Sequence, residues 1–172
     1  MKELLKDISK IAIELKEEQI VFSNEQIKNI WIGYNPSNDN EIINIEKKLG
    51  ITLPKEYKEF MKITNGFSQS TITEPEFYSI DKIDWLKNVD DELINIWKEN
   101  GLKDIGEQLE RAIIVADSNK EQQFLLISSI GNKEWKFWKF GNWIPGEEEY
   151  ENLENYFEKT LEFLIEIKNE FK

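Results

Sequence analysis

The sequence predicts an α+β fold, in which an antiparallel meander sheet carries helices packed on one face. Three observations lead to this class. Apolar residues recur at helical spacing in the first third of the chain and again near its C-terminal end. Three runs of strand composition, at 112–116, 124–130 and 134–140, follow one another with turn-like connections. The regular strand–helix alternation of a doubly wound parallel sheet is missing from the sequence.

The first part of the chain predicts a helix followed by a loop. Residues 4–15 place Leu, Ile and Ala at three- and four-residue steps, which is typical of an amphipathic helix. Residues 19–32 fit either a short helix or a short strand. Residues 33–40 are rich in Gly, Pro, Ser, Asn and Asp, which indicates a loop. We expect residues 1–35 to be a helical lead that packs on a domain formed by residues 36–172.

Two further helices are predicted before residue 66. The first covers residues 42–49 and stops at Gly50. Pro54 starts the second helix, since proline is tolerated in the first turn. The pair Asn65 and Gly66 is expected to close it, because glycine adopts the left-handed conformation that ends many helices.

The middle and the end of the chain supply the sheet and the last helix. Residues 70–80 hold two short strand candidates, 71–73 and 77–80, and residues 81–100 predict one or two surface helices. A loop is expected around Gly101 and Gly106, and another over residues 142–150. The strand at 134–140 breaks clean alternation, which indicates that both faces of the sheet are partly covered. Leucine and aromatic residues at 153–165 predict a long C-terminal helix.

Composition removes many activities. The 172 residues include 22 basic and 34 acidic side chains, a formal charge of -12, and neither Cys nor His. Disulfides, thiolate catalysis, thiolate zinc sites and the Ser-His-Asp triad are therefore excluded, and only carboxylate, Lys or Tyr chemistry remains. The acidic balance and a single arginine, Arg111, disfavour nucleic-acid binding and anionic lipid. We expect no cofactor, no metal and no membrane span, and a cytoplasmic location.

Two sequence patterns resemble ligand loops but lack essential residues. Gly101 and Gly106 have the spacing of a phosphate loop, yet acidic Glu107 follows where lysine is required. The run from Asp117 has the first ligands of a calcium loop, but Gln122 replaces the glycine of the sharp turn. A loop and a hairpin turn are the preferred interpretations.

Acidic and aromatic residues in predicted loops are the candidate partner contacts. Carboxylates cluster in two places, and adjacent carboxylates are usually solvated, although they also attract a basic partner. Loop aromatics are enriched at binding hot spots, although they more often cap a core. The candidate contacts are Trp143, Glu147, Glu148, Glu149, Asp90 and Asp91.

The segment 46–66, EKKLGITLPKEYKEFMKITNG, resembles the signature of the SMI1/KNR4 (SUKH) family. Weaker similarity follows at residues 113–119, at a strand tryptophan and at 153–164, so that the resemblance covers about residues 36–165. The resemblance implies structural roles, in packing or in shaping the backbone, for the matched positions. These positions are Leu49, Gly50, Leu53, Pro54, Tyr57, Phe60, Asn65, Gly66, Asp117 and Trp138.

The resemblance also implies a function. Bacterial members of the family are mostly immunity proteins that bind and neutralise toxins, many of them nucleases, and the family is not known for catalysis. A basic toxin domain is then the expected partner, since a nuclease site must hold phosphate. Two alternatives remain open: a scaffold or regulatory interaction module unrelated to toxins, and a carboxylate-based hydrolase, which would need two facing acids in a deep cleft.

Overall fold

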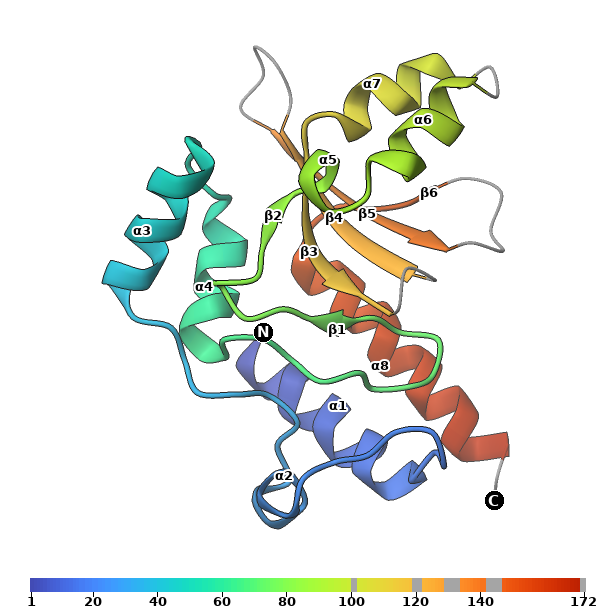
Figure 1. The fold of residues 1–172 in the computed structure, drawn as a ribbon. Helices are drawn as coiled ribbons and strands as arrows, with labels where there is room; N and C mark the ends of the chain where they lie inside the picture. The colour runs from blue at the N-terminus through green and yellow to red at the C-terminus, as the bar shows by residue number, and fades with distance from the viewer. Residues whose placement is uncertain (100–101, 119–121, 129–133, 142–146, 171–172) are drawn as a thin grey trace.

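The computed structural model describes residues 1–99, 102–118, 122–128, 134–141 and 147–170, and Figure 1 shows their arrangement. The helices are α1 (Lys2–Leu15), α2 (Asn24–Asn29), α3 (Asp39–Leu49), α4 (Lys55–Ile63), α5 (Leu86–Val89), α6 (Asp91–Glu99), α7 (Lys103–Leu109) and α8 (Leu153–Glu170). The strands are β1 (Glu76–Phe77), β2 (Asp84–Trp85), β3 (Ala112–Asp117), β4 (Gln122–Ser128), β5 (Trp135–Gly141) and β6 (Glu147–Tyr150).

The described strands form one antiparallel sheet in the order β1-β3-β4-β5-β6, and β2 also pairs with β3. The strands β3 to β6 follow one another in sequence and in space, which is the arrangement of a meander. The predicted α+β class and the antiparallel meander are therefore confirmed.

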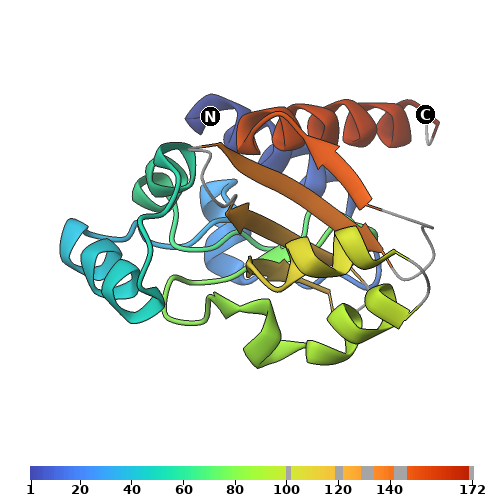
Figure 2. The ribbon, with the colours of Figure 1, turned by 90° about the horizontal axis from the view of Figure 1, so that it is seen from above.

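Helices lie on both faces of this sheet. In Figure 2, α1 and α8 lie on one side of the strands, and α5, α6 and α7 lie on the other. Alternating side chains of the central strands explain this: Ile113 and Leu126 belong to the larger core, whereas Ile114 and Leu125 belong to a second core. The sequence predicted helices on one face of the sheet, and the structure has a second layer of helices on the other face. The broken alternation at residues 134–140 had indicated that both faces are covered.

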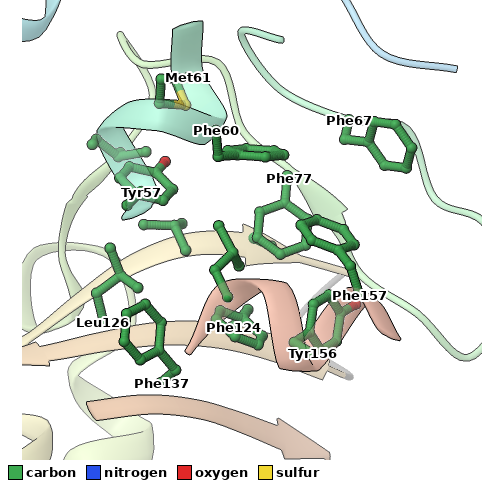
Figure 3. Close-up of a cluster of buried hydrophobic side chains, with 14 of the residues drawn as sticks. Tyr57, Phe60, Met61, Phe67, Phe77, Phe124, Leu126, Phe137, Tyr156 and Phe157 are labelled. Atoms are coloured by element: carbon green, nitrogen blue, oxygen red, sulfur yellow. The ribbon is translucent and has the colours of Figure 1, made fainter. Parts of the chain in front are cut away.

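Aromatic rings fill the larger core. Figure 3 shows Phe60 from α4, Phe77 from β1 and Phe157 from α8 meeting above the sheet. The ring centroids of Phe77 and Phe157 are 5.2 Å apart, and those of Phe124 and Tyr156 are 4.6 Å apart. Helices α4 and α8, which are far apart in the sequence, are thus joined to the sheet through one continuous aromatic cluster.

The family signature at 46–66 has a physical basis in the turn between α3 and α4. Gly50 ends α3 at a φ of 70°, in the left-handed region that favours glycine. Glu46 then spans the turn: its Oε1 accepts a 2.9 Å hydrogen bond from the backbone N–H of Leu53 and lies 3.0 Å from Nζ of Lys58. Pro54 precedes the first turn of α4 as its N-cap. The carboxylate and the two backbone-shaping residues together fix the angle between the helices.

The Asn65–Gly66 pair, which was predicted to close α4, lies just after the end of this helix. Helix α4 ends at Ile63, and Thr64 is extended, so the pair does not itself cap the helix. Gly66 has a φ of 98°, and a Cβ there would lie 2.9 Å from the carbonyl oxygen of Phe77. The side-chain oxygen of Asn65 accepts a 2.7 Å hydrogen bond from the N–H of Ile80. The pair therefore holds the segment after α4 against the segment after β1.

Three sequence predictions of local structure were wrong. Residues 71–73 form a turn in place of a strand, because Oγ1 of Thr71 accepts a hydrogen bond from the backbone N–H of Thr73. The region predicted as a loop around Gly106 contains helix α7, where Gly106 permits a close approach to the backbone of Lys98 in α6. The last four residues of the predicted loop at 142–150 form β6, because they pair with β5.

The N-terminal segment is integrated with the rest of the fold. Leu5, Ile8 and Ala12 of α1 are buried in the larger core, and α1 lies beside α8. Helix α2 resolves the ambiguity of residues 19–32 in favour of a short helix and buries no side chain of its own.

Candidate functional site

The acidic run at 147–149 lies in the outermost strand of the sheet. Strand β6 is last in the strand order and pairs with β5, with Glu147 opposite Phe140, Glu148 opposite Lys139 and Glu149 opposite Trp138. An edge strand presents backbone groups and side chains to the surroundings, and charged residues on an edge also oppose aggregation. At Glu148 and Glu149 the strand therefore forms an accessible acidic border.

Two carboxylates of this border are exposed and point to opposite faces of the sheet. The side chain of Glu148 accepts a 2.8 Å hydrogen bond from the hydroxyl of Tyr150. Glu149 lies 3.9 Å from Nζ of Lys136, with both side chains substantially exposed. Such an exposed pair contributes little to stability, so Glu149 is free to exchange its partner at low cost.

The second acidic cluster, at the start of α6, divides into a structural residue and an exposed one. Asp90 is 9% exposed, and its carboxylate accepts hydrogen bonds from the N–H of Leu93 and, at 2.8 Å, from the amide of Gln123. Asp90 therefore anchors α6 to β4, and its expected role as a partner contact is corrected. Asp91, the next residue, is exposed in the first turn of α6.

The fold brings both acidic clusters to one end of the sheet. Gln123, the partner of Asp90, lies opposite Phe140, and Phe140 lies opposite Glu147. Neighbouring strands are about 4.8 Å apart, so the β4 residue that holds the start of α6 lies about two strand spacings from β6. We refer to Asp91, Glu148 and Glu149 as the acidic end of the sheet. Trp143, the remaining predicted contact, lies outside the described residues.

A buried ionic network lies beneath this end. Nζ of Lys139 in β5 is 2.6 Å from Oε1 of Glu74, and both side chains are 9% exposed. The other oxygen of Glu74 accepts a 2.5 Å hydrogen bond from the hydroxyl of Tyr156 in α8. Glu74 thus connects the turn before β1 to β5 and to α8. No sequence pattern identified this network, although a lysine between Trp138 and Phe140 in an aromatic strand was the one available signal.

A shallow pocket of about 290 Å³ lies over this network, with Glu74, Lys139, Glu148, Tyr150 and Lys159 in its walls. Its groups are poorly suited to acid–base catalysis. Both carboxylate oxygens of Glu74 already accept strong bonds. Burial, with the nearby carboxylates of Glu148 and Glu74, raises the pKa of Tyr150 and of Tyr156 above the ordinary value, so that both phenols stay protonated near neutral pH. The pocket therefore offers hydrogen-bonding groups without a free base.

The motif residues lie in structural positions. Leu49, Leu53, Tyr57 and Phe60 are buried in the larger core, and Trp138 is buried in the second one. Burial, with the nearby carboxylate of Asp117 at the end of β3, raises the pKa of Tyr78 above its ordinary value. Among the described residues, no group of three or more His, Cys, Asp or Glu side chains is placed to hold a metal ion. None of the described helices is both long and apolar enough to span a bilayer.

Comparison with known proteins identifies the family. The model of the SMI1 / KNR4 family (SUKH-1) matches residues 36–164, which is most of the chain, and the chain belongs to this family. The family generally includes immunity proteins and is generally non-catalytic. The match begins after α2, so the N-terminal segment lies outside it. A search of curated proteins finds no match.

Proposed function

We propose that this chain is an immunity protein that acts in the cytoplasm, binds a cognate protein toxin and neutralises it by occlusion. The observation that carries the proposal is the acidic end of the sheet in a chain of the SUKH-1 family. Asp91, Glu148 and Glu149 are exposed around this end, with Glu148 and Glu149 on opposite faces of the edge strand, on a protein with a charge of -12. A toxin with a basic active site, such as a nuclease, is complementary to this surface.

The charge of the whole chain supports fast capture of such a partner. Opposite net charges steer two proteins together and raise the association rate constant by one to three orders of magnitude at low salt. Exposed charges are screened over about 8 Å at physiological ionic strength, so the association rate should fall steeply as salt is added. The buried Glu74–Lys139 pair supports the function indirectly, because it anchors β5, the strand that pairs with the edge strand β6.

The test uses the product of the open reading frame beside the gene as the toxin. We expect the two proteins to co-purify after co-expression, and stopped-flow mixing to give an association rate that decreases with salt. The double variant Glu148→Lys/Glu149→Lys should reduce this rate at least tenfold. Glu56→Lys/Glu59→Lys is the matched control. It makes the same change in net charge on exposed positions of α4, near the opposite end of β5.

Equal losses in the two variants would show that only net charge matters, and would contradict a role for the acidic end of the sheet. Toxin neutralisation would be contradicted if the neighbouring product formed no complex with the chain and if toxins encoded elsewhere in the same genome also failed to bind it.

A further inference from the structure

The N-terminal segment carries an apolar surface that the fold itself does not use. Eleven large apolar side chains are exposed among the described residues, and four of them, Val21, Ile27, Ile30 and Tyr34, lie within fourteen consecutive positions. Single exposed apolar residues are ordinary, whereas a cluster of them indicates a site of association.

Helix α2 is held in place with its apolar side chains facing outward. Ser23 and Gln26 form a capping box at its start, and the amide of Gln26 donates to the carbonyl oxygen of Ile32 at 2.9 Å and to Oγ of Ser68 at 2.8 Å. Polar contacts thus fix the helix, and Ile27 and Ile30 remain about half exposed. These polar contacts hold the helix on the body of the protein, and none of its own side chains is fully buried.

Ile30 is unfavourable in two respects in the isolated chain. It ends α2 at a φ of 51°, a left-handed conformation that is unfavourable for a β-branched residue. Its side chain is also 52% exposed, so internal packing does not offset this cost. A strained, exposed isoleucine suggests a role in a contact outside the monomer.

A groove of about 770 Å³ separates this segment from α1. Ile30, Trp31 and Tyr34 line one wall. The opposite wall is formed by α1, on which lysines at positions 2, 6 and 10 make one row and acidic residues at positions 3 and 7 make the next. With Glu25 added, three basic and three acidic side chains line the groove, so that its net charge is zero on a protein of -12.

This charge pattern identifies the occupant. A surface for a basic partner would be acidic, and two copies of a chain with a charge of -12 repel each other least where the charge is locally balanced. A two-fold axis running along α1 places the lysine row of each copy against the acidic row of the other, with Lys2 facing Glu3 and Lys6 facing Asp7 at matching heights. The lysine stems then cover the exposed ring of Tyr34 and Ile30 of the second copy.

We infer that this groove is the interface of a homodimer, in which the α1 helices of the two copies lie side by side and the segment 20–36 of each copy flanks the contact. Sixteen residues line the groove. A standard interface uses about 20–30 residues a side, so the groove with its rim at Val21 and Ile27 forms a contact near the lower limit of size. The dimer is accordingly weak, with a micromolar dissociation constant, and it does not depend on the proposed function.

Sedimentation equilibrium of the purified chain tests the inference. The average mass should rise from 20.5 kDa toward twice that value between about 1 and about 200 μM, a range that brackets micromolar affinity. Ile30→Glu should weaken the dimer at least tenfold. Ile165→Glu, at a similarly exposed isoleucine of α8 outside the groove, should leave it unchanged.

Charge reversal separates this interface from any other. Lys2→Glu/Lys6→Glu gives two acidic rows, Glu3→Lys/Asp7→Lys gives two basic rows, and each variant alone should remain monomeric. An equimolar mixture of the two should associate again. A wild-type chain that stays monomeric over the whole range, a dimer insensitive to Ile30→Glu, or a mixture that fails to associate would each overturn the inference.

Discussion

Removing the buried ammonium of Lys139 should destabilise the protein severely. In Lys139→Met, the carboxylate of Glu74 stays buried and keeps the hydroxyl of Tyr156 as a donor, but it loses the cation 2.6 Å away. Breaking a buried ion pair on one side costs about 3–5 kcal/mol. For a chain of 172 residues this loss corresponds to a decrease in melting temperature of about 10 °C. Urea denaturation followed by tryptophan fluorescence measures the free energy directly.

The double variant Glu74→Met/Lys139→Met is the decisive comparison. It removes both buried charges, and its main remaining cost is the unpaired hydroxyl of Tyr156, about 1–3 kcal/mol. The double variant should therefore be more stable than Lys139→Met alone, with the loss recovered further when Tyr156→Phe is added. A double variant whose loss equals or exceeds the sum of the two single losses would refute the reasoning.

Three further outcomes follow from the fold. Gly66→Ala should cost more free energy of unfolding than Gly50→Ala, because both residues have positive φ but only at Gly66 does a Cβ meet backbone atoms; equal urea midpoints would contradict this. Trp138→Ala should cost about 3–5 kcal/mol, since the ring is 1% exposed, and a loss below about 1 kcal/mol would show that the ring is not packed. Burial raises the pKa of Tyr57 and Tyr156, so folded tyrosines keep their protons where unfolded ones ionise, and the tyrosine contribution to stability should be constant up to about pH 10 and fall above it. Phenolate absorbance at alkaline pH should then appear together with unfolding, and a gradual rise in the folded protein would contradict buried phenols.

The sequence predicted the sheet and the helix pair of the family signature well because their patterns are local. The apolar run at 112–116 and the turn-like connections defined β3 to β5. Gly50 marked the end of α3 and Pro54 the start of α4 through their backbone preferences alone. These signals depend on neighbouring residues in the chain, so they can be read without the tertiary structure.

The elements that were missed depend on distant partners. Strand β6 has the composition of a loop, and it becomes a strand only by pairing with β5. Helix α7 contains Gly106, whose lack of a side chain serves contact with α6. Glu74 and Lys139 are 65 positions apart, and nothing in either segment indicates that they meet. Tertiary context overrides local propensity in all three cases.

The sequence predicted which acidic residues belong to the candidate site, but it could not predict their tertiary contacts. Acidic residues at 90–91 and 147–149 were selected for charge alone, and the fold places them at one end of the sheet through Gln123 and Phe140. The role of Asp90 was misassigned because a carboxylate that caps a helix and one that faces a partner have the same local sequence. The exposed isoleucines of α2 were overlooked because residues 19–32 matched neither helix nor strand clearly.

Titration of the product of the neighbouring open reading frame, tested as the toxin, with the purified chain tests the central proposal most directly. Isothermal titration calorimetry, run in parallel with an assay of toxin activity, should give a one-to-one complex with a nanomolar dissociation constant and a loss of toxin activity in proportion to the chain added. Toxin that stays fully active in the presence of excess chain would contradict the account.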